Sequence, residues 1–180
     1  MIEANIKTIG VQALDSATAA EIKKASTEVQ PQADGSKVAV LDFQSAKADI
    51  PSGISVLEEM HKSDTDFITY GSGEINLGAI LPLAGGKFGS RKADSGTIFN
   101  LFGDSAKAGK GRKTLTAEEK NALEILDKLS SGRKARIKAF MLSGTKATAA
   151  DMKSLGLIDK VEGEFVDKYE QARKDAKKKK

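Results

Sequence analysis

The sequence contains no cysteine and a single histidine, His61, among its 180 residues. Without cysteine the chain can form neither a disulfide framework nor a thiolate nucleophile or thiolate metal site. A zinc site would need to be built almost entirely from carboxylates, which is not the ligand set that zinc prefers. We therefore expect no metal, no other cofactor and no cysteine-based catalysis.

Long hydrophobic runs are also missing. No apolar run approaches the roughly 20 residues that a membrane-spanning helix needs. The first ten residues, MIEANIKTIG, lack the basic stretch and apolar core of a signal peptide. These absences predict a soluble, cytoplasmic protein without a membrane partner.

The bulk composition predicts one folded domain with a basic tail. A chain of 180 residues with 39% hydrophobic content can bury one core and does not need two. We place the domain at residues 1–163 and the tail at 164–180. Much of the net charge of +4 lies in the final RKDAKKKK. Basic tails without interleaved aromatic residues bind polyanions only weakly, so the tail favours a solvated helix end over a nucleic-acid arm.

Hydrophobic patterning in the first half alternates between strands and helices. Strands are predicted at IKTIGVQ, KVAVLDF and FITYG, each followed by a helical pattern, and the third helix contains Pro82. Such alternation predicts an α/β fold with parallel strands joined by right-handed crossovers, and a functional site at the strand carboxyl ends. The nearly continuous apolar run KVAVLDF further predicts a strand that is covered on both faces of the sheet.

The second half adds one strand and several helices with clear starting signals. SGTIFNLF reads as a strand, and Thr116 with Glu119 forms a capping box before a helix that stops at Gly132. RKARIKAFML predicts another helix, and Thr148 with Asp151 marks a further helix start.

The glycine-rich stretch FITYGSGEINLGAILPLAGGKFGS raises the question of a phosphate-binding loop. After Gly71 and Gly73, the third glycine of a dinucleotide fingerprint should fall at position 76, where the chain has Asn76. The later GGKFGS lacks the G-K-[ST] ending of a Walker loop. We therefore do not expect a nucleotide cofactor.

Four segments, in this order and at nearly this spacing, resemble ClpP, the proteolytic subunit of the Clp protease, within the crotonase-like group. KVAVLDF precedes a loop, and PSGISVLEEM is similar to the family's SPGGSVxAGxxIYDTM. INLGAILPLAGGKFGSR is similar to SMGAxLLAAGxKGKR, and TAADMKSLGLIDKV to SAxEAxEYGLIDxV. The resemblance covers roughly Ile6 to Val161. It implies a ClpP/crotonase-like core of repeated ββα (βαβ) units, with a shortened handle insertion at Gly103 to Gly132.

The same resemblance implies that no catalytic set is intact. The nucleophile position falls on Asn76, and the histidine position falls on Asn100 or Leu101. The position of the acid falls at Gly144, within MLSGTKA, which contains no carboxylate. The family's paired glycines, whose backbone helps to form the oxyanion hole, are replaced by two other residues, Lys47 and Ala48. His61 cannot substitute for the base, because it lies on the polar side of an earlier predicted helix.

These assignments predict a catalytically degenerate ClpP-like protein. In the family, subunits form rings that stack through the handle. We expect a homo-oligomeric ring, structural or regulatory in role, either alone or mixed with active ClpP-type subunits. The short handle puts the stacking of rings in doubt.

Two alternatives stay open. The first is an active serine-type peptidase or an acyl-CoA enzyme with an unrecognised site in the same cleft. A serine-lysine pair for such a site would come from Ser45, Ser72, Ser90, Lys47, Lys87 and Lys92. The second alternative is a polyanion binder that uses the tail together with Lys107, Lys110, Arg112 and Lys113.

Overall fold

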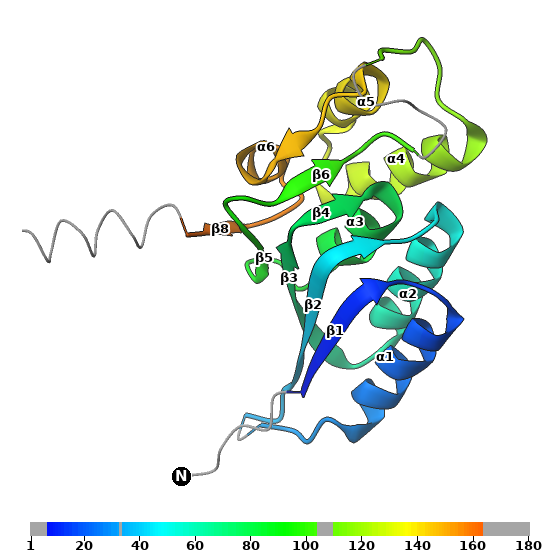
Figure 1. Ribbon diagram of the computed structural model, residues 1–180. Coiled ribbons are helices and arrows are strands. Elements are labelled where there is room, and N and C mark those ends of the chain that lie inside the picture. The colour runs from blue at the N-terminus through cyan, green and yellow to red at the C-terminus, as the bar shows by residue number, and fades with distance from the viewer. Residues whose placement is uncertain (1–6, 33, 104–109, 164–180) are drawn as a thin grey trace, which may run out of the picture.

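The computed structural model describes residues 7–32, 34–103 and 110–163 (Figure 1). Its main sheet has five parallel strands in the order β1-β2-β3-β5-β8. Their bounds are β1 Lys7–Ala13, β2 Lys37–Lys47, β3 Thr65–Ser72, β5 Arg91–Asp94 and β8 Lys160–Glu162. A second sheet consists of β4 Glu74–Asn76, β6 Ile98–Asn100 and β7 Ala147–Thr148. The predicted α/β fold with parallel strands is confirmed.

Six helices complete the described part of the chain: α1 Ser16–Glu28, α2 Ile50–Lys62, α3 Leu77–Ala84, α4 Ala117–Leu129, α5 Lys134–Ser143 and α6 Ala149–Ser154. Both predicted capping boxes are present. The Thr116 side chain accepts a hydrogen bond from the Glu119 amide at 3.2 Å, and the Thr148 side chain accepts one from the Asp151 amide at 3.2 Å. The first four backbone N–H groups of a helix have no acceptor within the helix, so a side chain that accepts from one of them favours a helix start at that residue.

The prediction that both faces of β2 are covered is wrong. Ala39, Leu41 and Phe43 are fully buried, whereas Val38 and Val40 on the opposite face are only half-buried. Figure 1 shows α1 and α2 along one side of β1 and β2. An apolar run by itself cannot distinguish a strand covered on both faces from one whose second face is merely apolar.

The strand predicted at SGTIFNLF is shorter in the structure, and a separate strand precedes it. The Thr97 amide donates to the Asp94 carbonyl at 3.0 Å, which closes a turn between β5 and β6. This turn moves the chain from the main sheet into the second sheet. Of the second sheet, the sequence predicted only the strand that contains β6; β4 and β7 have no counterpart in the prediction, because they are only three and two residues long.

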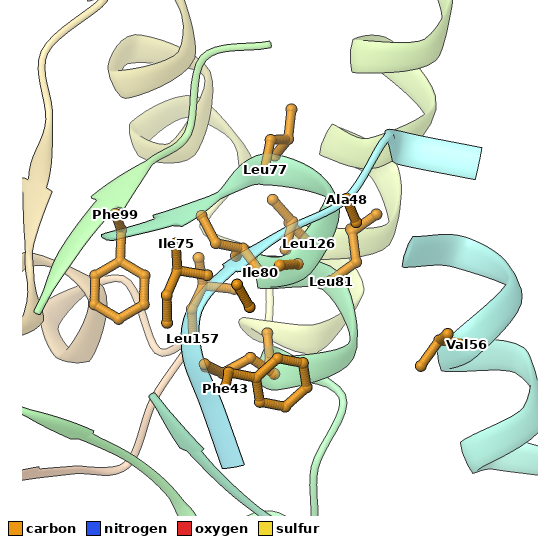
Figure 2. Close-up of a cluster of buried hydrophobic side chains, with 14 of the residues drawn as sticks. Phe43, Ala48, Val56, Ile75, Leu77, Ile80, Leu81, Phe99, Leu126 and Leu157 are labelled. Atoms are coloured by element: carbon orange, nitrogen blue, oxygen red, sulfur yellow. The ribbon is translucent and has the colours of Figure 1, made fainter. Parts of the chain in front are cut away.

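The buried side chains form one continuous cluster centred on α3. All eight residues of α3 are buried, which matches its strongly apolar sequence LGAILPLA. Figure 2 shows Ile80 and Leu81 of this helix between Phe43 of β2, Phe99 of β6 and Leu126 of α4. The core therefore fixes the start of α3 relative to both sheets and to the insertion.

Candidate functional site

A hollow of about 390 Å³ lies at the amino-terminal end of α3. Three segments form its walls: the loop after β2 with Ala48 and Asp49, the start of α3 from Asn76 to Gly78, and the beginning of α4 from Thr116 to Glu119. Gly103 also lines the hollow. Because β2 and β4 both end here, the hollow is at the strand carboxyl ends, where the sequence placed a functional site.

The Asn76 side chain closes one wall of this hollow. Its carboxamide oxygen accepts a hydrogen bond from the Ala48 amide at 2.9 Å, and its nitrogen donates to the Ala48 carbonyl at 2.8 Å. The same oxygen accepts from the Ala79 amide at 3.3 Å, so Asn76 also caps α3. The backbone polar groups of Ala48 are thus both engaged by a single side chain.

Asn100 lies directly beside Asn76, because β4 and β6 pair in parallel with these two residues in register. The side-chain nitrogen of Asn100 donates a hydrogen bond to the Glu74 carboxylate at 2.6 Å. The side-chain oxygen of Asn100 is buried without a hydrogen-bond partner among the described residues. Leu101, the other candidate for the histidine position, is fully buried in the core. The structure therefore brings Asn76 and Asn100 together and turns Leu101 away.

Glu74 holds the outer edge of this second sheet together. Lys146 donates to it at 3.1 Å, in addition to Asn100. Two hydrogen bonds, a larger contribution from Asn100 and a smaller one from Lys146, hold the pKa of Glu74 below its usual value. Glu74 is thus a structural ion-pair partner rather than a proton acceptor poised near neutral pH.

Gly144 and Lys47 occupy positions that suggest no chemistry. Gly144 is buried, has a left-handed backbone with φ of 66°, and ends α5, a conformation that favours glycine. Lys47 is the exposed last residue of β2. The exposed position of His61 on α2 agrees with its predicted place on a polar helix side.

The serine-lysine candidates do not form a pair. Lys87 forms an ion pair with Asp66, and Lys92 forms one with Glu162 at 2.8 Å. The sequence offered Ser45, Ser72 and Ser90 as nucleophiles for such a pair. Among the described residues, no side-chain hydrogen bond joins any of these three serines to a lysine. A lysine general base would need to be desolvated beside its serine, and these lysines are held in surface ion pairs instead.

Glu119 is a site residue that the sequence marked only as a helix cap. It is 1% exposed, accepts from the amides of Gly103 at 3.1 Å and Thr116 at 2.8 Å, and forms an ion pair with Arg112. Burial raises the pKa of Glu119, but the hydrogen bonds from Arg112 and the two amides outweigh it and leave the pKa below its usual value. Arg112, assigned to a polyanion patch in the second alternative, is committed to this buried contact.

Metal and membrane sites were also sought in the described ranges. No cluster of three or more histidine, cysteine or carboxylate side chains there could hold a metal ion. None of the helices in those ranges has the length and apolar character needed to cross a bilayer.

Comparisons with known proteins identify the fold. No protein-family model matches the sequence, and no curated protein matches it either. Among solved structures, the ClpP protease catalytic domain from Plasmodium falciparum aligns with a TM-score of 0.69, covering 88% of this chain and 86% of that chain. The chain has a ClpP-like fold.

The ClpP-like fold confirms the resemblance of the four sequence segments at the level of architecture. Sequence identity to the Plasmodium domain is 17%, so the likeness concerns the fold and not the activity. The function of the hollow at Asn76 must therefore be inferred from the residues that line it in this chain.

Proposed function

We propose that this protein is a catalytically degenerate ClpP-like subunit that acts through assembly, as a structural or regulatory member of a ring formed alone or with an active Clp peptidase. The proposal includes a cytoplasmic location. The observation that carries it is that the Asn76 carboxamide, at the position that the sequence resemblance assigns to the nucleophile, binds both backbone groups of Ala48.

The Asn76 side chain removes two catalytic requirements at once. A serine peptidase needs a hydroxyl nucleophile and amide donors that stabilise the oxyanion of the tetrahedral intermediate. A carboxamide has no hydroxyl to attack a carbonyl carbon. In addition, the Ala48 amide, which the sequence resemblance assigns to the oxyanion hole, already donates to Asn76.

The remaining members of a triad are also missing from the proposed site. Asn100, beside Asn76, is not a base at neutral pH and donates its amide to Glu74. Gly144 supplies no carboxylate. The nearest buried carboxylate in the hollow, Glu119, is saturated by Arg112 and two amides and cannot orient a base.

The test of lost catalysis is the Asn76→Ser variant. We expect no hydrolysis of a fluorogenic peptide above that of the unmodified protein, because a nucleophile without its base and acid loses nearly all activity, on the order of 10⁶-fold in a well-studied protease. Asn76→Ala serves as the matched control, since it loses the same Ala48 contacts without gaining a hydroxyl. Turnover specific to the serine variant and blocked by a serine-directed inhibitor would overturn the proposal.

The unmodified protein tests the alternative of a relocated active site. We expect no labelling by a fluorophosphonate probe. Labelling that is lost on replacing one of Ser45, Ser72 or Ser90 by alanine would establish a serine enzyme instead.

The assembly part of the proposal is tested by co-expression with an affinity-tagged active ClpP subunit. Mixed rings predict stoichiometric co-purification that withstands high salt. If the protein neither co-purifies nor forms oligomers by itself, assembly is not its function.

A further inference from the structure

A groove of about 500 Å³ lies where four segments meet that are far apart in the sequence. These segments are the loop between α3 and β5, the turn between α4 and α5, the end of α6 and the chain just before β8. Figure 1 shows β5, β8 and α6 next to one another. The groove shares no lining residue with the hollow at Asn76. We call it the basic groove, and its charged and aromatic residues are Phe88, Arg91, Arg133, Lys153, Asp159 and Lys160.

The charges along the basic groove do not balance. Arg91 and Asp159 neutralise each other, because two side-chain contacts of 2.9 and 2.7 Å join them. Among the described residues, Arg133, Lys153 and Lys160 form no ion pair with a carboxylate. Within the described part of the chain the groove therefore has an excess of three positive charges, which favours an anionic partner.

The guanidinium of Arg133 is held in place at the basic groove. It donates a hydrogen bond to the carbonyl of Ser154, at the end of α6. Its Nε atom lies beside Gly156, 3.5 Å from the place that a Cβ atom of that residue would take. A guanidinium has five N–H donors, so this one hydrogen bond leaves others that can bind a carboxylate.

Phe88 borders the basic groove and is the one large hydrophobic side chain that is exposed in the described ranges, at 81%. Its loop is fixed on both sides, because the Lys87 amide donates to a carbonyl of β3 at 2.7 Å and the Gly89 amide donates to Asp159 at 2.8 Å. The ring centre lies 5.3 Å from the guanidinium carbon of Arg91. Single exposed apolar side chains are common on protein surfaces. Phe88 differs because a hydrogen-bonded loop holds it beside a cationic groove, as a preorganised anchor for a partner is held.

An acidic peptide with an apolar residue matches both features of the basic groove. Carboxylates pair with lysine and bind the planar guanidinium of arginine in a bidentate geometry. An apolar side chain of the peptide that covers the Phe88 ring removes apolar surface from water. A nucleic acid matches less well, because the described residues contain 21 lysines and arginines against 19 acidic residues. A surface so close to neutral attracts a phosphate backbone only weakly.

We propose that the basic groove docks a partner protein through an acidic segment that contains an aromatic or aliphatic residue. That residue packs on Phe88, and the neighbouring carboxylates bind Arg133, Lys153 and Lys160. The neutral arginine–aspartate pair of the groove fixes the Phe88 loop through the Gly89 amide. All of these residues belong to one chain, so docking does not depend on the proposed ring.

The test is the binding of a defined peptide to the full-length protein. The probe is a fluorescein-labelled decapeptide with four acidic residues on each side of a central phenylalanine–leucine pair, and fluorescence anisotropy measures its dissociation constant. We expect saturable binding that weakens roughly tenfold when two serines replace the central pair, as for an anchor at the centre of an interface. Phe88→Ser should weaken binding of the first peptide by a similar factor and should abolish the difference between the two peptides.

The charges of the groove are tested with Lys153→Ser and Lys160→Ser together. This double variant should weaken binding of the first peptide roughly fivefold, as expected for the loss of two exposed ion pairs. The matched control is Lys23→Ser with Lys120→Ser, which removes the same charge from exposed positions on α1 and α4 and should change the affinity less than about twofold. Every substituted position is exposed, and unchanged thermal unfolding verifies that the variants fold.

Three outcomes would overturn the proposal. The first is no saturable binding of the acidic peptide, or equal affinities for it in Phe88→Ser and the unmodified protein. The second is displacement of the peptide by a ten-residue oligothymidylate at an equal or lower concentration, which would assign the groove to nucleic acid. The third is a lower mass of Phe88→Ser than of the unmodified protein in light scattering without peptide, which would make the groove a contact between copies of this chain.

Discussion

Asn76 shows how one residue can be both a helix cap and a tie between distant segments. Its carboxamide accepts at one end and donates at the other, so it matches the paired amide and carbonyl of Ala48, 28 residues earlier in the chain. Each such hydrogen bond contributes about 1 kcal/mol net. The contacts with Ala48 and the cap of α3 give asparagine a structural role at this position.

Asn76→Asp should destabilise the protein by about 2 kcal/mol at pH 7. A carboxylate can still accept from the amides of Ala48 and Ala79, but it cannot donate to the Ala48 carbonyl, and an unpaired buried acceptor costs about 1–3 kcal/mol. Protonation restores a donor, so the deficit relative to the unmodified protein should shrink near pH 3. Urea denaturation at both pH values measures this. A deficit that is the same at both pH values would show that the Ala48 carbonyl is not the cause.

At the scale of elements, the starts of α2 and α3 are held in backbone contact by glycines. A Cβ atom on Gly53 would lie 2.0 Å from the Gly78 carbonyl oxygen, and one on Gly78 would lie 2.3 Å from the Ala48 carbonyl oxygen. Because the opposing atoms are backbone, no side-chain rotation can make room. This close approach sets the position of the loop that lines the hollow.

Gly78→Ala should therefore destabilise the protein by about 3 kcal/mol through overpacking. Gly96→Ala is the matched control, since a Cβ atom there meets nothing within 4 Å, and it should change stability by less than about 0.5 kcal/mol. Thermal unfolding followed by circular dichroism compares the two variants. Equal stabilities would mean that α2 and α3 separate easily.

A buried ion pair joins β5 to the segment before β8. Arg91 is 3% exposed, binds Asp159 through two side-chain contacts of 2.9 and 2.7 Å, and also donates to the carbonyls of Ala84 and Leu129, each at 3.2 Å. Burial raises the pKa of Asp159, but the hydrogen bonds from the Arg91 side chain and backbone dominate and lower it. One guanidinium thus connects the ends of α3 and α4 with β5 and with the segment before the edge strand β8.

The lowered pKa values of Asp159 and Glu119 predict loss of stability in acid. A carboxyl group with a lower pKa in the folded state adds stability that is present above the unfolded-state pKa of about 4 and is lost as pH falls through the folded-state value. Asp159→Asn should cost about 3 kcal/mol at pH 7 by leaving Arg91 unpaired. It should also flatten the decline of unfolding free energy below pH 4.

The control for this pH dependence is Glu21→Gln, which changes an exposed carboxyl on α1 and should leave the curve nearly unaltered. Denaturant titrations from pH 7 to pH 2.5 compare the three proteins. An acid limb as steep in Asp159→Asn as in the unmodified protein would show that other groups dominate acid unfolding.

At the scale of the whole molecule, the proposed ring makes a prediction about mass. Rings repeat the same two surfaces on every subunit, so assembly should be closed and discrete. Light scattering coupled to size exclusion should give a fixed multiple of 19.1 kDa over a wide concentration range. A monomer at all concentrations would count against assembly while leaving the degenerate site untouched.

The sequence by itself determined the alternation of strands and helices and the helix starts. Capping boxes and hydrophobic periodicity are local signals, so Thr116 with Glu119 and Thr148 with Asp151 could be read without knowledge of neighbours. The four ClpP-like segments also indicated the fold, which the structural match to the ClpP domain confirms although sequence identity is 17%.

Only the tertiary structure decided which residues meet at the hollow. The Asn76–Ala48 contact, the Glu119–Arg112 pair and the register of Asn76 with Asn100 join residues whose spacing gives no local signal. The same holds for β2, where composition alone suggested two covered faces and packing covered one. Local patterns fix what a segment prefers, whereas partners, burial and exposure depend on long-range packing, which no short window of sequence contains.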